Sequence, residues 1–113
     1  MGLEEKRRFP RMPLRIPLHY QVRGTSKFNN TIINDISSSG LGFTNSEFIA
    51  PNTTLALELN ILSRVLRPVG RVAWSSPLPH SDRCRLGLEF LELDPKEKNY
   101  LSGYIDMKAA KGI

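Results

Sequence analysis

The chain has 113 residues, a formal net charge of +5, a pI near 9.7 and a single cysteine, Cys84. One domain of this length buries one modest core, and a lone thiol excludes an internal disulfide and fits a reducing cytoplasm. No apolar run approaches the roughly 20 residues that span a bilayer, so we expect no stable membrane insertion. The surplus of positive charge predicts an anionic partner, which from composition alone can be RNA, DNA, a membrane surface or a phosphorylated small molecule.

Residues 1–12 are polar and basic, and Pro10 and Pro13 discourage a helix there, so we expect a flexible tail. Beyond the tail, apolar and polar residues alternate with a period of two, which is typical of half-buried strands. Pro17 has no amide hydrogen to donate, so we expect an edge or a bulge at that point of the first strand. Together with the turn residues, the alternation predicts six strands, over residues 14–22, 28–35, 41–44, 55–61, 65–75 and 84–90.

A helix is predicted at the end of the chain. Asp94 is a good N-cap residue, Pro95 suits the first helical position, and Glu97 occupies the acceptor place of a capping box. The stripe of apolar residues that follows is consistent both with a plug for an open barrel end and with a docking face for a partner. These residues recur every three or four positions, at Tyr100, Leu101, Tyr104 and Ile105.

The elements in this order predict an all-β fold class, a small six-stranded antiparallel β-barrel with a C-terminal α-helix. The expected parts are a basic tail over residues 1–12, the barrel over residues 13–93 and the helix over residues 94–111. An antiparallel return of the second strand brings its end, at Asp35, back near the start of the first strand. The basic tail and this corner are therefore expected to meet.

Residues 35–40, Asp-Ile-Ser-Ser-Ser-Gly, join the second and third strands. Asp and Ser side chains hydrogen-bond to nearby backbone, and Gly adopts a positive φ without strain, so one interpretation is a well-made turn. The tail adds a second interpretation, because Arg7 and Arg11 carry planar forks of donors that suit phosphate and the O6/N7 edge of guanine. Asp35 offers two acceptors for the N–H donors on the opposite guanine edge. Together these groups are the ones needed to hold a guanine nucleotide.

The two motifs, Arg-x-x-x-Arg at residues 7–11 and Asp-x-Ser-x-x-Gly at residues 35–40, resemble those of the PilZ domain family. No defining position is substituted, and the similarity continues in Leu-Gly-Phe at residues 41–43 and Gly-Leu-Glu-Phe at residues 87–90. Neither motif is specific alone, but both in this order around one strand hairpin form a strong signal. PilZ domains are bacterial receptors for the second messenger cyclic di-GMP, so the resemblance implies that ligand and a cytoplasmic signalling role.

The resemblance also implies roles for individual residues. Arg7 and Arg11 would clamp a guanine edge and the phosphates. Asp35 and Ser37 would receive the other guanine edge, and Gly40 would allow close approach. Binding would order the tail across the barrel, and that change would be the signal passed to an unidentified downstream protein.

Two further cations, Lys6 and Arg8, lie beside the first arginine of the motif. PilZ domains take either one cyclic di-GMP or a self-intercalated pair, and a pair carries twice the phosphate charge. Extra cations favour the pair, because charge-assisted contacts are the strong ones. We therefore predict two ligands per domain, with Lys6 and Arg8 among the binding residues and Arg8 contacting a phosphate or stacking on a base.

Trp74 shares its parity with Val72 on the fifth strand, which predicts that its indole lies in the core. The resemblance offers an alternative, because some PilZ domains place an aromatic residue at a similar strand end against the ligand's base. Cys84 falls on the apolar face of the last strand and is expected to be a small buried hydrophobe.

Catalysis and metal binding are not expected. An enzyme needs a nucleophile with a base, a carboxylate pair or a metal cluster, and one buried thiol with two isolated histidines, His19 and His80, supplies none of these. His19 falls on a polar strand face, where we expect no role beyond solvation. We therefore predict no catalytic residue, no metal ligand and no cofactor.

Two rival functions are a small basic β-barrel that binds RNA or DNA and an interaction adaptor without a ligand. The first usually needs exposed aromatics among basic residues on a strand face. The intact motifs argue against the second. We expect no nucleic-acid partner, because the strand aromatics share the parity of core residues; they are Tyr20, Phe43 and Phe90.

Overall fold

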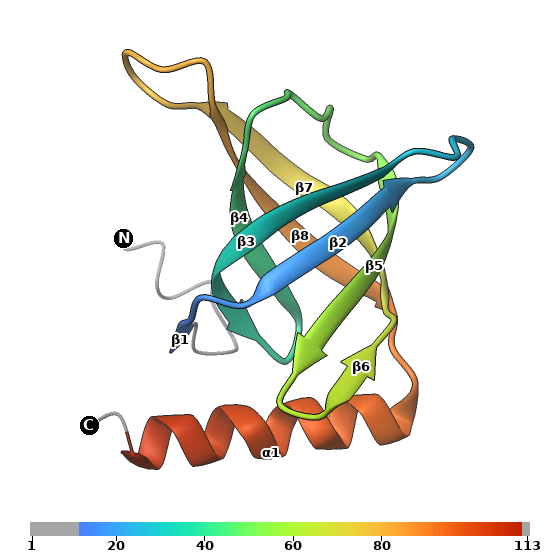
Figure 1. Cartoon of the computed structure of the whole chain (residues 1–113), viewed down its shortest axis with the longest axis vertical. Helices are drawn as coiled ribbons and strands as arrows, with labels where there is room; N and C mark the ends of the chain where they lie inside the picture. Colours follow the sequence, from blue (N-terminus) through green and yellow to red (C-terminus); the bar gives the residue numbers. More distant parts are fainter. Residues whose placement is uncertain (1–11, 112–113) are drawn as a thin grey trace, which may run out of the picture.

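The computed structural model describes residues 12–111, which form eight strands and one helix. In chain order these are β1 (Met12–Pro13), β2 (Pro17–Val22), β3 (Phe28–Ser37), β4 (Gly40–Asn45), β5 (Thr54–Ile61), β6 (Arg64–Leu66), β7 (Val69–Pro77), β8 (Cys84–Glu92) and α1 (Pro95–Lys111). Six strands close into an antiparallel barrel in the order β3, β2, β5, β7, β8, β4, and β4 returns to pair with β3 (Figure 1). The short strand β1 pairs with β3, and the short strand β6 pairs with β5. The predicted fold class is confirmed.

Alternating side chains build the core of the barrel. The rings of Tyr20 on β2 and Phe43 on β4 pack inside it with their centroids 5.6 Å apart. Burial raises the pKa of the Tyr20 phenol above its ordinary value, as expected for a neutral core residue. Strand β5 shows the period of two most clearly, since every second residue is buried; these are Leu55, Leu57, Leu59 and Ile61.

The first predicted strand, over residues 14–22, begins later than expected, at Pro17, and a separate two-residue strand, β1, precedes it. The link between β1 and β2 is held to β3 by the Leu14 amide, which donates to the Asn34 carbonyl at 3.0 Å. Pro17 is the first residue of β2, where its missing amide hydrogen interrupts no ladder. Strand β2 lies between β3 and β5, but Pro17 is paired only with Ile32 on β3 and the ladder with β5 begins at Leu18, so Pro17 lies at a local edge, as expected. The chain accommodates the proline by starting a strand there.

Helix α1 lies across one end of the barrel, beneath β5 and β6 in Figure 1. Leu101 and Tyr104 are buried in the same cluster as the barrel core, and Tyr100 and Ile105 pack beside them. The Tyr100 hydroxyl donates to the carbonyl of Ile61 at 3.0 Å. The apolar stripe therefore plugs the barrel end, the first of its two predicted roles. Within residues 12–111, no helix has the length and apolar character needed to cross a membrane.

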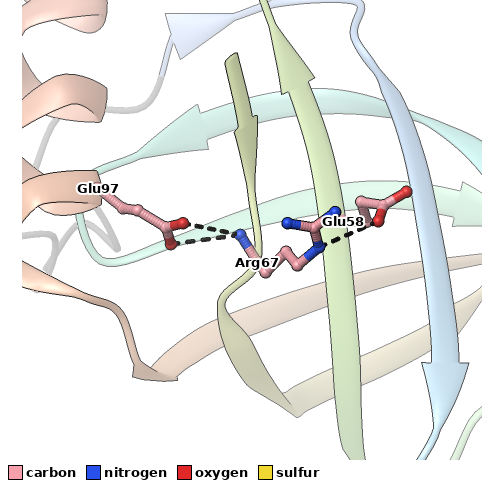
Figure 2. A network of polar contacts seen from close by, with 3 residues as sticks. All are labelled: Glu58, Arg67 and Glu97. Atoms are coloured by element: carbon pink, nitrogen blue, oxygen red, sulfur yellow. Dashed lines mark hydrogen bonds and ion pairs between the residues drawn. The ribbon is translucent and has the colours of Figure 1, made fainter.

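The start of α1 is fixed by two carboxylates. Asp94 Oδ1 accepts the Lys96 amide at 2.8 Å, which confirms the predicted N-cap. The Glu97 carboxylate does not complete a capping box. It accepts the backbone amide of Arg67 at 3.2 and 3.4 Å, and the Arg67 side chain donates to Glu58 at 3.3 Å (Figure 2). Glu97 therefore ties the helix to the link between β6 and β7.

Asp94→Ala should lower the free energy of unfolding by about 1 kcal/mol, because the Lys96 amide loses its capping acceptor. For a domain of this size, that loss corresponds to a melting temperature lower by roughly 4–8 °C. Urea unfolding measures the change directly, and Asp94→Asn, which keeps a capping oxygen, is the matched control. Equal stability of Asp94→Ala and the parent would show that the cap contributes nothing.

Candidate functional site

Ser38 and Ser39 close the hairpin between β3 and β4. The side chain before them, Ser37, is only 1% exposed. Its hydroxyl accepts the Ser39 amide at 3.2 Å and donates to the Gly40 carbonyl at 3.4 Å. These are bonds within the turn, as the turn interpretation of this stretch predicts. The serines that reach the surface are Ser38 and Ser39, which the sequence pattern did not single out.

Gly40 is needed for a close approach of strands and not for its backbone angle. Among the described glycines, only Gly24 has a φ in the left-handed region, at 92°, so the positive φ predicted for Gly40 is wrong. A Cβ on Gly40 would lie 2.0 Å from the carbonyl oxygen of Leu88 on β8. The Ser39 carbonyl accepts the Phe90 amide at 2.9 Å, which holds the turn against β8.

A β-bulge in β3 directs Asp35 to the outer face of the barrel. The register with β4 shifts between Ile33 and Asp35, which leaves Asn34 as an extra residue. Ile33 is buried in the core, whereas Asp35 Oδ2 lies 3.5 Å from Arg85 Nη2 on β8. Sequence reasoning missed Arg85. The available signal was its outward position in the alternation of the last strand.

Four residues form a row across neighbouring strands on the outer face: Asp35 on β3, Gly42 on β4, Gly87 on β8 and Trp74 on β7. Each is paired with the next in the ladder. A Cβ on Gly42 would lie 3.1 Å from Asp35 Oδ1, and one on Gly87 would lie 2.3 Å from Trp74 Nε1. The two glycines thus let the carboxylate from β3 and the indole from β7 both lie against the outer face of the sheet. We call these four residues the glycine row.

Trp74 is 46% exposed, so the predicted core position is wrong. The register between β7 and β8 shifts between Val72 and Trp74, which makes Ala73 an extra residue on β7. This bulge reverses the parity of the strand. Val72 therefore stays fully buried, while Trp74 emerges on the outer face and covers Gly87.

The basic residues that the sequence assigns to ligand binding lie outside the described residues; they are Lys6, Arg7, Arg8 and Arg11. Strand β1 nevertheless shows where the tail joins the barrel, because it pairs with Asp35 and Ile36 at the end of β3. Residue 12, which we expected in the tail, belongs to this strand. The described chain thus begins beside the corner, one residue after Arg11, as the predicted antiparallel return requires.

Within residues 12–111, no group of three or more His, Cys, Asp or Glu side chains could hold a metal ion. His19 has a partner that the alternation did not predict, since its Nδ1 is in hydrogen-bond contact with Asn30 Oδ1 across the β2–β3 pair. Cys84 is buried, as expected.

A closed six-stranded barrel with a motif-bearing hairpin and an end-capping helix defines the class of this protein. The sequence model of the PilZ domain matches residues 5–106, a span that includes both motifs. The chain belongs to the PilZ domain family. A comparison with curated proteins finds no match.

Solved structures share this fold at low sequence identity. The Bacillus subtilis inhibitor of motility (MotI/DgrA) aligns with a TM-score of 0.80 and 16% identity, over 93% of this chain and 52% of that one. The PilZ domain of Escherichia coli YcgR, solved with c-di-GMP, gives 0.74 and 16%, over 95% and 93%. The K. pneumoniae MrkH–c-di-GMP complex gives 0.73 and 15%, over 95% and 54%. This chain thus spans about half the length of the motility inhibitor and of MrkH.

Gly87→Ala should displace the Trp74 indole without unfolding the barrel, because the atoms that a Cβ would meet belong to a half-exposed side chain. Trp74 is the only tryptophan, so its fluorescence reports the change directly. We expect red-shifted emission and stronger quenching by acrylamide. Gly103→Ala, on α1 with open space around its Cβ, is the control. A Gly87→Ala spectrum identical to that of the parent would contradict the packing of the indole on Gly87.

Proposed function

We propose that this domain is a receptor for cyclic di-GMP in the bacterial cytoplasm and acts as a signalling adaptor, not as an enzyme. The observation that carries the proposal is the glycine row, where the Asp35 carboxylate and the Trp74 indole lie on one surface. Family membership, both intact motifs and the neighbouring structures of YcgR and MrkH, solved with c-di-GMP, support it.

The glycine row suits a guanine base lying against the barrel wall. The Asp35 carboxylate accepts the N1–H and N2–H donors of the base. Because Gly42 has no side chain, the Asp35 carboxylate lies against the backbone there, where it can meet the edge of a base placed beside it on the wall. The exposed indole of Trp74 offers an aromatic face for stacking, and such stacking is a common contribution to nucleotide binding. This assigns Trp74 the second of its two predicted roles.

The cations come from two places. Arg7 and Arg11 supply guanidinium forks for the phosphates and for the O6/N7 edge of guanine, with Arg8 beside them. Arg85 adds a cation on the barrel wall, next to Asp35. Because β1 begins beside Asp35, a ligand on the glycine row lies within reach of the motif arginines.

Ser37 and Gly40 contribute through the shape of the turn. Ser37 is buried and bonded within the hairpin, and Gly40 lets the hairpin close against β8. The hairpin also fixes the position of Asp35, which lies two residues before Ser37. The bound ligand then fixes residues 1–11 against the wall of the barrel, and a downstream protein recognises that arrangement.

Arg7→Ala and Arg11→Ala should each weaken cyclic di-GMP binding at least tenfold, a loss of about 1.4 kcal/mol, because each removes a charge-assisted fork. Calorimetry measures the affinity, and thermal unfolding should be unchanged. Arg15→Ala removes an arginine that is exposed and lies outside the motif, so it should bind like the parent.

Cyclic di-AMP should bind at least tenfold more weakly than cyclic di-GMP, because adenine carries an amino donor where guanine has O6.

Equal affinity for both cyclic dinucleotides would contradict the guanine contacts assigned here. Tight binding of a short RNA in place of cyclic di-GMP would favour the rival nucleic-acid function. Parent-like binding by a variant that lacks residues 1–11 would contradict the role of the tail.

Two cyclic di-GMP molecules should bind per domain at saturation, because Lys6 and Arg8 add cations beside Arg7 for the larger phosphate charge of a pair. Lys6→Leu and Arg8→Ala should lose or weaken the second ligand. Calorimetric stoichiometry is the measurement. A ratio of one that persisted at high ligand concentration would overturn the pair and leave the receptor assignment intact.

A further inference from the structure

A pocket of about 480 Å³ opens between Trp74 and the start of α1. This volume lies within the range of about 300–1,000 Å³ that small-molecule sites occupy. Trp74, Leu91 and Leu93 provide apolar lining, and Ser38 and Ser39 of the β3–β4 turn also border it. The pocket is therefore continuous with the glycine row, since Trp74 and Gly87 both line it, and it adjoins the Asp-x-Ser-x-x-Gly turn through Ser38 and Ser39.

Glu89 brings a fixed carboxylate to this pocket. Both Nε and Nη2 of Arg71 donate to the same oxygen, Oε1, with Nε at 2.8 Å. Among residues 12–111, no donor is bonded to the second oxygen, Oε2. Arg71 thus balances the charge of Glu89 and leaves Oε2 as an acceptor that no donor among residues 12–111 occupies.

Lys98, the fourth residue of α1, also lines the pocket. Its side chain is exposed and forms no ion pair with any described residue. The acid that shares the pocket is Glu89, which is already paired with Arg71. The pocket therefore combines apolar walls and a carboxylate acceptor with a cation that has no counter-ion in the described chain.

We propose that this pocket is a further subsite for cyclic di-GMP, an inference that rests on the proposed function. A guanine base stacks beside Trp74 and directs an N–H donor to Glu89 Oε2, while Lys98 pairs with a ligand phosphate. Guanine fits this acceptor because its Watson–Crick edge carries two N–H donors. The subsite makes α1, which otherwise plugs the barrel, a direct part of the ligand site.

Calorimetry with cyclic di-GMP on the full 113-residue chain tests the cation. Lys98→Ala should bind about threefold to tenfold more weakly, the loss expected for one partly exposed phosphate contact, and its affinity should depend less on salt. Lys96→Ala is the matched control, because Lys96 is exposed on the same helix and does not line the pocket. Both variants should keep the melting temperature of the parent.

Glu89→Gln tests the base contact through the sign of its effect. If Glu89 supplied only charge, removing a negative charge beside an anionic ligand would strengthen binding. The proposed contact predicts binding at least about threefold weaker, because Arg71 would hold the amide oxygen and leave the NH₂ group facing the N–H edge of guanine. A melting scan confirms that the variant is folded.

Binding of cyclic di-GMP by the parent protein upholds the proposed function. Given that binding, unchanged affinity in Lys98→Ala or tighter binding by Glu89→Gln would overturn this subsite alone. A parent protein that failed to bind cyclic di-GMP would overturn both. Weaker binding by both variants, with Lys96→Ala unchanged, supports the subsite.

Discussion

Three positions along the β4–β8 ladder carry no side chain, and the rest of the site depends on that absence. At Gly40, a Cβ would lie 2.0 Å from the carbonyl oxygen of Leu88, so only glycine lets β4 close against β8 beside the serine turn. At Gly42 and Gly87, the space is taken by side chains from the two neighbouring strands. One strip of backbone therefore completes the barrel and also forms the floor of the candidate ligand site.

Two bulges place the functional side chains on either side of this strip. Asn34 in β3 and Ala73 in β7 are the extra residues that shift the alternation of their strands. Asp35 and Trp74 consequently lie on the outer face, while Ile33 and Val72, each two residues earlier, stay in the core. Bulges recur next to functional sites because they re-aim one side chain and leave the surrounding ladder intact. The core thus follows regular alternation, and the site follows from two local departures from it.

Alternation alone predicts the barrel core, because each strand has one buried face and a slip of one residue would expose it. The motif at residues 35–40 likewise predicts the corner, and the antiparallel return of the second strand predicts that the start of the described chain, at β1, lies beside Asp35. The exposure of Trp74 is not predictable in this way, since no pattern marks Ala73 as an extra residue. The contact between Arg85 and Asp35 joins positions 50 residues apart and depends on a strand pairing that local sequence does not specify. The bond between the Glu97 carboxylate and the Arg67 amide is not predictable for the same reason, because Arg67 lies outside the helix.

The most direct test of the account is a titration with cyclic di-GMP followed by amide correlation spectra of isotope-labelled protein. The glycine row predicts that the largest shifts fall on the Gly42 and Gly87 amides and on the Trp74 indole N–H, together with residues 5–11. Signals from β2 and β5 should change little, since these strands are not part of the row. Saturable shifts confined to β2 and β5, with the glycine row unperturbed, would contradict the account.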